Sequence, residues 1–346
     1  MRVEKKQIGT IDEKEVYLFT LKNTKGSTLK VMSYGATATE WWVPNHSGEY
    51  NNVLVSPKTL EDYQNHRPFH GSVVGPVAGR IAGAHFDLNG QSVDLDKNEE
   101  NNHLHGGEKG WDTRVWDGQI EEGIDEIAVI FTSQITTDES GYPGNISAQV
   151  RYALTEKNEW ILSYEVKTDA PTILNPTNHV YFNLNGRKQS IYDHTLELKS
   201  SHVLALGEGN LPTGEKIAVS GTPFDFIKGK PIREALESTH PQIQLAKGLD
   251  HAFLLDQADN KEPVVRLSDP MSGRQLKVFT DRQAVVIYTH NHKAQELNIS
   301  QYEGIAFETQ MVPDAIHSKE YKEFVIFTPD NPLKSKTTFQ MTVIEA

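Results

Sequence analysis

Apolar and polar residues alternate in short runs along most of the chain. Residues 15–21 (EVYLFTL), 146–155 (ISAQVRYALT) and 160–168 (WILSYEVKT) follow a two-residue period and are rich in β-branched and aromatic side chains. Successive side chains of a strand point to opposite faces, so this period predicts β-strands with one buried face. The polar stretch 156–159 (EKNE) between the last two runs is typical of a turn.

Two further segments predict strands joined by short turns. Residues 85–95 (HFDLNGQSVDL) place Asn89-Gly90 between two alternating arms. This dipeptide favours a tight hairpin, because both of its residues adopt positive φ readily. Residues 273–280 (GRQLKVFT) and 284–290 (AVVIYTH) repeat the strand–turn–strand arrangement around a polar tripeptide. We expect each arm to be a strand.

Helical patterns are scarce in this chain. The best candidate is 231–238 (PIREALES), which is short and begins with proline. Strand patterns return at 324–329 and 337–346, and no fixed repeat or Pro/Gly/Ser-rich linker divides the chain. We therefore expect an all-β fold with few short helices, in which residues 1–346 form a single large antiparallel β-sandwich domain.

Composition narrows the class of protein. The 346 residues include 47 acidic and 34 basic ones, giving a formal net charge of −13. Such a surface repels nucleic acid and anionic membranes, so neither is expected as a partner. The chain has no cysteine, which excludes disulfides and thiolate metal sites. No segment has the pattern of a signal peptide or of a membrane span, and we expect a cytoplasmic protein.

Residues 101–107 (NNHLHGG) contain the first candidate site. On a strand, His103 and His105 would point to the same face. The following Gly106-Gly107 permits a tight turn or the close approach of another group. A loop histidine bonded to the backbone is the alternative interpretation.

The same two histidines suggest a metal site as a second hypothesis. His103 and His105 form an H-x-H pair, and His290 and His292 form another. Only Glu108 follows the first pair closely, however, and a metal site also requires supporting partners that a sequence does not reveal. We expect no metal and no other cofactor.

Two more segments place a titratable side chain among apolar ones. His179 lies in 177–183 (TNHVYFN), which reads as strand, and a neutral imidazole near aromatic rings suits proton donation. Glu308 lies in 305–310 (IAFETQ), where a buried carboxylate costs free energy unless it is paired or used. A core histidine and an edge-strand glutamate are the alternatives.

Asp250 in 248–253 (GLDHAF) and Arg80 in 75–81 (GPVAGRI) also carry charge within uncharged surroundings. Arg80 in particular would need partners. The chain contains no GxSxG elbow, no phosphate-binding loop and no HExxH zinc motif. These residues alone leave a β-protein with histidines and carboxylates in apolar settings.

Taken in order, these segments resemble the aldose 1-epimerase (galactose mutarotase) family over nearly the full length. The NNHLHGG, PTNHVYFNLNG and IAFETQ blocks are the most specific. The resemblance implies a large antiparallel β-sandwich with a sugar site in a cleft on one sheet. It also implies an isomerase that interconverts the anomers of a free hexose such as galactose or glucose without a cofactor. The matching blocks are 33–37, 78–90, 101–107, 176–186, 211–215, 222–226, 248–253 and 305–310.

The resemblance also implies catalytic roles. Glu308 corresponds to the base that takes the proton of the anomeric hydroxyl, and His179 to the acid that protonates the ring oxygen. His105 corresponds to a second histidine near that oxygen. A glutamate ionised at pH 7 and a histidine with a pKa near 6.5 would supply this pair without strong tuning.

Substrate contacts are implied for Arg80 and Asp250, which resemble residues that hold sugar hydroxyls, and for Asn102, which would hold the sugar or the neighbouring loop. The chain departs from the family pattern in 75–81, where an arginine and an asparagine are missing, and at Val180, where a small polar residue is usual. These departures affect the hydroxyl contacts and hence the sugar preference. Tyr181, Phe182, Trp41 and Trp42 could pack on the sugar, but for most of them ordinary core packing is the favoured interpretation.

Besides a metal-dependent β-barrel enzyme that would use His103, His105, His290 and His292, two other functions remain open at this point. One is epimerisation of a phosphorylated hexose, which would need clustered Arg or Lys. The other is a carbohydrate-binding protein of the same fold without catalysis. The expected partner in each case is a small sugar, and the protein is expected to be a monomer or a homodimer.

Overall fold

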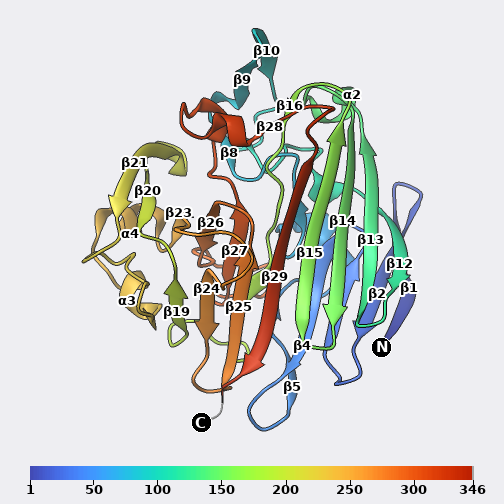
Figure 1. Ribbon diagram of the computed structural model, residues 1–346, viewed down its shortest axis with the longest axis vertical. Helices are drawn as coiled ribbons and strands as arrows, with labels where there is room; N and C mark the ends of the chain where they lie inside the picture. Colours follow the sequence, from blue (N-terminus) through green and yellow to red (C-terminus); the bar gives the residue numbers. More distant parts are fainter. Residues whose placement is uncertain (345–346) are drawn as a thin grey trace.

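The computed structural model describes residues 1–344 and consists mainly of antiparallel sheets, with 47% of residues in strands and 10% in helices (Figure 1). A five-stranded sheet comes first in the chain. Its strands follow the chain order: β1 (Arg2–Ile11), β2 (Lys14–Lys22), β3 (Thr28–Met32), β4 (Thr37–Pro44) and β5 (Tyr50–Asn52).

The largest sheet has nine strands. Its order is β12 (Asp117–Glu122), β13 (Glu126–Ile135), β14 (Ile146–Thr155), β15 (Glu159–Thr168), β29 (Leu333–Val343), β25 (Arg274–Thr280), β24 (Val265–Ser268), β19 (Thr195–Leu198) and β22 (Lys230–Pro231). The last long strand of the chain, β29, therefore lies at the centre of this sheet (Figure 1).

A seven-stranded sheet carries the candidate site. Its order is β21 (Pro212–Ala218), β20 (His202–Leu206), β23 (Asp250–Leu254), β26 (Ala284–Tyr288), β27 (Ile305–Gln310), β18 (Tyr181–Phe182) and β6 (Leu54–Val55). Short pairs complete the strands: β9 (His85–Leu88) with β10 (Gln91–Asp94), β8 (Arg80–Ile81) with β11 (His103–Leu104), β7 (Val73–Val74) with β17 (Thr177–Asn178), and β16 (Thr172–Ile173) with β28 (Ile326–Phe327).

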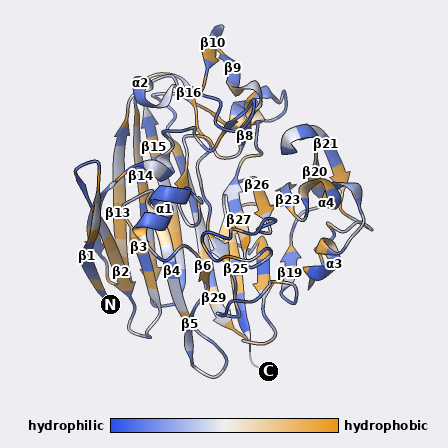
Figure 2. Cartoon of the chain, turned by 180° about the vertical axis from the view of Figure 1, so that it is seen from behind, coloured by the Kyte–Doolittle hydropathy of each residue, from blue (hydrophilic) through white to orange (hydrophobic). Residues whose placement is uncertain are grey.

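The helices are short. They are α1 (Leu60–His66), α2 (Thr137–Ser140), α3 (Arg233–Leu236) and α4 (Pro241–Ala246), with 3-10 turns η1 (Ala82–Ala84), η2 (Trp111–Thr113), η3 (Glu208–Asn210), η4 (Ala315–His317) and η5 (Lys322–Phe324). Seen from behind, the polar helix α1 lies over the five-stranded sheet (Figure 2). Within residues 1–344, no helix is long and apolar enough to cross a membrane.

The nine-stranded sheet packs face to face against the seven-stranded sheet. Phe182 and Phe307 of the seven-stranded sheet have ring centroids 6.2 Å apart, and Phe182 lies 5.3 Å from Phe339 of β29. Trp160 of β15 contacts Phe339 at 4.8 Å and also Trp41 of the five-stranded sheet at 5.9 Å. All three sheets thus share one apolar core, which confirms the predicted β-sandwich.

The strand predictions for the middle of the chain are confirmed. Residues 146–155 and 160–168 pair as β14 and β15, and burial alternates along β15 and along β14 as far as Tyr152. The hairpin predicted at 85–95 forms with Asn89 and Gly90 at φ of 52° and 77°. The local pattern was sufficient here because the turn residues and the alternation specify the same register.

Other local predictions need correction. Both strands predicted at 273–280 and 284–290 form, as β25 and β26, but the second ends at Tyr288. The two lie in different sheets, so the turn between them crosses the sandwich. The helix predicted at 231–238 covers only Arg233–Leu236, and the strand predicted at 324–329 only Ile326–Phe327. For the strand predicted at 337–346, β29 runs to Val343, and residues 345–346 lie outside the described part.

Candidate active site

A cavity of about 520 Å³ opens on the face of the seven-stranded sheet that points away from the core. Strand register fixes its floor, because residues directly opposite one another in antiparallel strands share a face. Asp250 lies opposite Tyr288 on the neighbouring strand, and in the next row Val286 lies opposite Glu308. Tyr181 of β18 continues the floor, and all five side chains line the cavity.

A carboxylate and an imidazole meet in this cavity from distant parts of the chain. Glu308 Oε1 lies 3.5 Å from Nε2 of His179, and the two residues are only 3% and 6% exposed. Both side chains line the same cavity, as the roles that the resemblance implies for them require. Both atoms can therefore contact neighbouring oxygens of one small molecule that lies beside them in the cavity.

Burial changes the ionisation of both groups. It raises the pKa of Glu308 to about 8, although the nearby Arg80 acts in the opposite direction. It lowers the pKa of His179 to about 4. Desolvation thus shifts both pKa values away from the expectation of an ionised glutamate and a histidine near 6.5, because it disfavours the charged form of each group.

The sequence around His179 suggested a strand, but His179 itself lies outside the strands. It occupies the connection between β17 and β18. Its backbone is fixed on both sides: its N–H donates to the carbonyl of Ser72 at 2.9 Å, and its carbonyl accepts from the N–H of Gly71 at 2.9 Å. Its Nδ1 has no hydrogen-bond partner among the described residues, so the ring is positioned by the backbone and by packing.

His105 lies beside His179 in a left-handed backbone conformation. Its φ is 54°, and its ring centroid is 5.4 Å from that of His179. The N–H of Gly79 donates to Nδ1 of His105 at 3.1 Å. In the neutral ring the hydrogen therefore sits on Nε2. Burial lowers the pKa of His105 well below its usual value, and the positive charges of protonated His179 and of Arg80 act in the same direction.

The glycine pair after His105 permits a close backbone contact. Gly106 has a φ of 85°, and a Cβ atom there would lie 1.9 Å from the carbonyl oxygen of Gly75. Phe69, also at positive φ, packs its ring 4.8 Å from that of His105. Residues held in such conformations at a cavity wall indicate that the surrounding structure maintains their positions.

Arg80 and Asp250 are the next polar side chains that line the cavity. Glu99 accepts two hydrogen bonds from Arg80, from Nε at 2.6 Å and from Nη2 at 2.7 Å. Such a bidentate pair fixes the plane of the guanidinium and leaves its other N–H groups free to donate. Burial raises the pKa of Asp250 to about 7, with Arg80 opposing the shift and the charges of Glu308 and Glu99 adding to it.

A family model described as aldose 1-epimerase matches residues 17–340. The chain belongs to the aldose 1-epimerase family. Members of this family are isomerases that work without a cofactor. The resemblance inferred from the sequence blocks is thereby confirmed.

Relatives of known identity cover the whole chain. A maltose epimerase of Levilactobacillus brevis is 31% identical over 344 residues, which is 99% of each chain. An aldose 1-epimerase of Escherichia coli is 32% identical over 330 residues, 93% of this chain and 94% of the other. The crystal structure of a galactose 1-epimerase from Lactobacillus acidophilus superposes with a TM-score of 0.89 at 32% identity and covers 99% of both chains.

The predicted substrate residue Asn102 does not line the cavity of this epimerase-family site. Its side-chain oxygen accepts from the N–H of Gly83 at 3.2 Å, and its backbone exchanges two hydrogen bonds with Glu99. Asn102 therefore holds the loop that carries Glu99, which is the second of the two roles anticipated for it.

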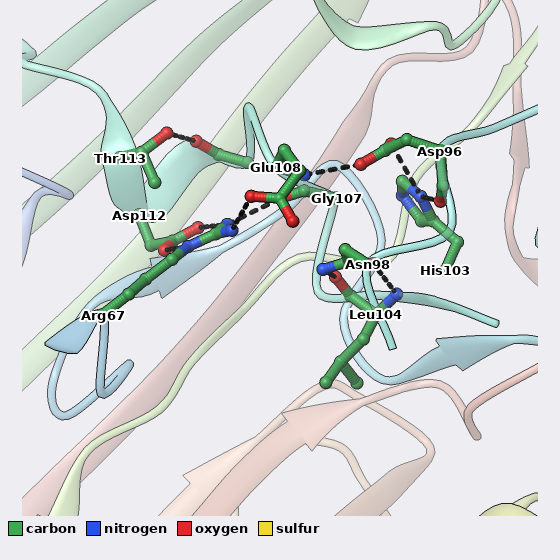
Figure 3. A network of polar contacts seen from close by, with 10 residues as sticks. Arg67, Asp96, Asn98, His103, Leu104, Gly107, Glu108, Asp112 and Thr113 are labelled. Carbon is green, nitrogen blue, oxygen red and sulfur yellow. Dashed lines mark hydrogen bonds and ion pairs between the residues drawn. The ribbon is translucent and has the colours of Figure 1, made fainter. Parts of the chain in front are cut away.

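His103 and His105 do not share a face, so the H-x-H metal hypothesis fails on geometry. The strand β11 ends at Leu104, and His103 turns into the protein, where its Nε2 lies 2.9 Å from the hydroxyl of Tyr142. Its Nδ1 lies 2.8 Å from the carbonyl oxygen of Asp96 (Figure 3). Within residues 1–344, no group of three or more His, Cys, Asp or Glu side chains is placed to hold a metal.

The loop that contains these histidines is fixed by a polar network. Arg67 donates from Nε to Asp112 at 2.7 Å and from Nη2 to the carbonyl of Gly107 at 2.6 Å (Figure 3). The Asn98 side chain accepts from the N–H of Leu104 and donates to its carbonyl, at 2.7 and 2.9 Å. The network lies next to His105 and stabilises the loop around it.

Sequence reasoning missed several cavity residues. Glu99 stood out in no motif, although an arginine in apolar surroundings implied a partner. Phe69, Tyr288 and His70 lie outside the blocks that carried the resemblance, and no pattern indicated them. Of the aromatic candidates, only Tyr181 lines the cavity. Trp41 and Phe182 belong to the core, and Trp42 lines a separate cavity of about 710 Å³ over the five-stranded sheet.

Proposed function

We propose that the protein interconverts the α and β anomers of a free aldose by opening and closing its ring. The observation that carries this proposal is the pair of His179 Nε2 and Glu308 Oε1, 3.5 Å apart at the floor of a cavity of about 520 Å³. A binding protein needs no such pair, because hydroxyl recognition alone does not require an acid and a base in contact.

The chemistry follows from the two oxygens that share the anomeric carbon. Glu308 takes the proton from the anomeric hydroxyl while the bond between the anomeric carbon and the ring oxygen breaks. The electron pair of that bond goes to the ring oxygen, which takes a proton from His179. After the aldehyde end has rotated, the ring oxygen attacks the other face of the carbonyl and both protons return. Each positioned proton transfer contributes about 10²–10⁴ in rate.

The remaining groups orient the sugar. His105 presents its Nε2 hydrogen next to His179 and can donate to the ring-oxygen side. Arg80 donates to hydroxyl oxygens with the N–H groups that Glu99 leaves free, and ionised Asp250 accepts from hydroxyls. Tyr288 and Phe69 supply apolar surface for the C–H face of the ring.

The substrate class is proposed as a free hexose such as galactose or glucose. A sugar phosphate is disfavoured, because three carboxyl groups, those of Glu99, Asp250 and Glu308, surround the single arginine of the cavity. The family relatives named for maltose and for galactose indicate that a reducing disaccharide should be assayed beside the hexoses.

The test is polarimetry of freshly dissolved α-glucose, α-galactose and xylose, with a hexose 6-phosphate beside them. We expect equilibration of a free sugar well above the enzyme-free rate, and a loss of about 10²-fold or more in Glu308→Gln and in His179→Asn. The matched control is Glu323→Gln, an exposed glutamate outside the cavity, which should keep full activity. Near wild-type rates in both cavity variants would refute the proposal.

A further inference from the structure

The cavity of about 710 Å³ over the five-stranded sheet takes no part in the ring-opening chemistry, because neither Glu308 nor His179 lines it. We call it the second cavity. One side of it is formed by β2, β3 and β4, and another by α1, which lies over this sheet (Figure 2). The segments that follow β18 and precede β27 complete its walls. It is larger than the catalytic cavity, and its volume suits a small-molecule ligand.

One wall of the second cavity is apolar. It is made by side chains of a small cluster between α1 and the sheet, namely Ile8, Leu18, Met32, Leu60 and Tyr63. Trp42 of β4 adds an indole ring and is 37% exposed. Nε1 of Trp42 donates to Glu40, which fixes the orientation of the indole. A fixed and exposed aromatic ring offers a surface on which the ring of a ligand can pack.

The remaining lining carries positive charge, in contrast to a chain whose formal net charge is −13. Lys58, Arg187 and Lys188 are exposed and line the second cavity. None of the three forms an ion pair with a carboxylate of residues 1–344. Lys188 donates to the carbonyl of Asn298, which occupies only part of its ammonium group and leaves its charge uncompensated.

The carboxylates of the second cavity already have partners. Glu40 pairs with Lys30 at 2.8 Å and also accepts from Trp42. Glu303 is 8% exposed, and one of its oxygens accepts from the N–H of Ser300 at 2.7 Å. Cationic side chains therefore outnumber carboxylates along this lining and keep unused donors, which favours an anionic ligand.

The catalytic cavity has the opposite balance of charge. Its lining contains more carboxyl groups than cationic side chains: Glu99, Asp250, Glu296 and Glu308 against Arg80 and Lys293. A phosphate group is disfavoured there and favoured in the second cavity, because local charge selects the sign of the ligand. The second cavity thus suits a ligand of a different class from the neutral substrate.

Two elements connect the cavities. Ala294 lines the catalytic cavity, Ile299 lines the second one, and Leu297 lines both. Ala294 and Ile299 exchange two backbone hydrogen bonds of 3.0 Å, which hold the segment between them closed. The helix α1 makes the other connection, because Leu60 at its start lines the second cavity and His66 at its end lines the catalytic one. A ligand in the second cavity therefore contacts elements that also shape the catalytic cavity.

We propose that the second cavity binds a small ring compound that carries a phosphate group, and that its occupancy changes substrate binding in the catalytic cavity. The phosphate accepts from the unpaired cationic side chains, and the ring packs on Trp42 and the adjoining aliphatic wall. A sugar phosphate and a nucleotide share this chemistry and differ in the ring. The effect on substrate binding rests on the proposed function, whereas the binding of the phosphate compound does not.

Calorimetric titration tests the binding with glucose 6-phosphate and with adenosine monophosphate, and with inorganic phosphate and glucose as partial ligands. We expect at least one ester to bind about tenfold more tightly than either partial ligand. In the double variant Lys58→Ala/Arg187→Ala this affinity should fall about tenfold or more, because charge-assisted hydrogen bonds are lost. Lys319→Ala, an exposed lysine outside both cavities, is the matched control and should keep the affinity. Glu308→Gln should keep it too, because it alters only the catalytic cavity.

Fluorescence locates the bound ester. Trp42 is exposed, whereas the other tryptophans, Trp41, Trp111, Trp116 and Trp160, are buried. Binding should therefore change the emission of the wild type and leave that of Trp42→Phe unchanged, although phenylalanine keeps a ring for packing and retains the affinity. An unchanged emission of the wild type on saturation would place the ester elsewhere and overturn the site.

Polarimetry tests the effect on substrate binding. With saturating ester, KM for glucose should change about fivefold in the wild type and stay constant in Lys58→Ala/Arg187→Ala, and without ester the two proteins should have the same KM. No binding of either ester, or equal affinity in wild type and double variant, would overturn the site. A constant KM in the saturated wild type would overturn its coupling to catalysis. Failure of the proposed function would instead appear as absent mutarotation with ester binding intact.

Discussion

The proton held between Glu308 and His179 determines how catalysis should depend on pH. Burial raises the pKa of Glu308 to about 8 and lowers that of His179 to about 4, which favours the neutral pair over the ion pair by ~5 kcal/mol. At a separation of 3.5 Å and an effective dielectric constant of about 20, the attraction between the two charges is ~5 kcal/mol, which offsets this preference for the neutral pair. The two forms therefore have similar free energies, and the proton can move between them at low cost.

We predict that kcat is level while the pair holds one proton and falls when it holds none. The pair keeps a single proton between about pH 4 and pH 8. At pH 9 about one tenth of the enzyme retains it, so kcat should be about tenfold lower than at pH 6. In His179→Asn, Glu308 is the one member of the pair that still titrates, and its ionised form is the active one. The residual kcat of this variant should therefore rise about tenfold between pH 7 and pH 9.

The assay is polarimetry with saturating sugar across this pH range, with the enzyme-free rate subtracted at each pH. Saturation removes effects of pH on binding, so the profile reports the filled site. Glu323→Gln should reproduce the wild-type profile. A wild-type kcat that climbs above pH 8 in parallel with His179→Asn would show that His179 donates no proton, and the reasoning on the pair would be wrong.

Three further predictions concern the cavity wall. In Glu99→Gln, Arg80 loses its bidentate carboxylate, so KM should rise about 5–10-fold. Because Glu99 raises the pKa of Asp250, the pH dependence of KM should also move to lower pH in this variant, and an unshifted KM profile would contradict this. For the wild type, KM should fall as pH rises through about 7, where Asp250 ionises and accepts hydroxyls more strongly, whereas KM of Asp250→Asn should not depend on pH in this range. Gly106→Ala should lower the free energy of unfolding, measured in urea, by about 2 kcal/mol more than Gly90→Ala. Both glycines have positive φ, but only a Cβ at position 106 would meet a carbonyl oxygen, so equal losses would refute the role of that contact.

The sequence was sufficient for the fold wherever neighbouring residues determine the structure. Alternation and the Asn89-Gly90 turn predict their strands correctly, because the pattern and the turn chemistry agree. The path of the chain after β25 could not be predicted. Whether a strand pairs with its predecessor or crosses to the other sheet depends on long-range packing, and the local pattern of 284–290 is compatible with both.

The same limit applies to the site. One cavity is lined by all five of the remaining candidates, Glu308, His179, His105, Arg80 and Asp250. The order of the family motifs along the chain could suggest this shared cavity, but the spacing of the residues in the sequence could not show it. The pKa shifts of the pair could not be predicted, because complete burial is a property of the folded molecule and not of a segment. Asn102 was ambiguous for a similar reason: an amide serves a loop as well as a ligand.

The alternation of β26 and β27 has a consequence for how substrate preference can change during evolution. Glu308, Val286 and Tyr288 line the cavity, whereas their immediate neighbours, among them Phe307 and Ile287, belong to the hydrophobic interior. Substitutions at 286 or 288 can therefore reshape selectivity while the interior that holds the molecule together stays unaltered. Shifting either strand by one residue would instead exchange the two faces and bury the carboxylate among phenylalanines. New specificities are thus accessible by replacing side chains on this sheet, but not by inserting residues into it.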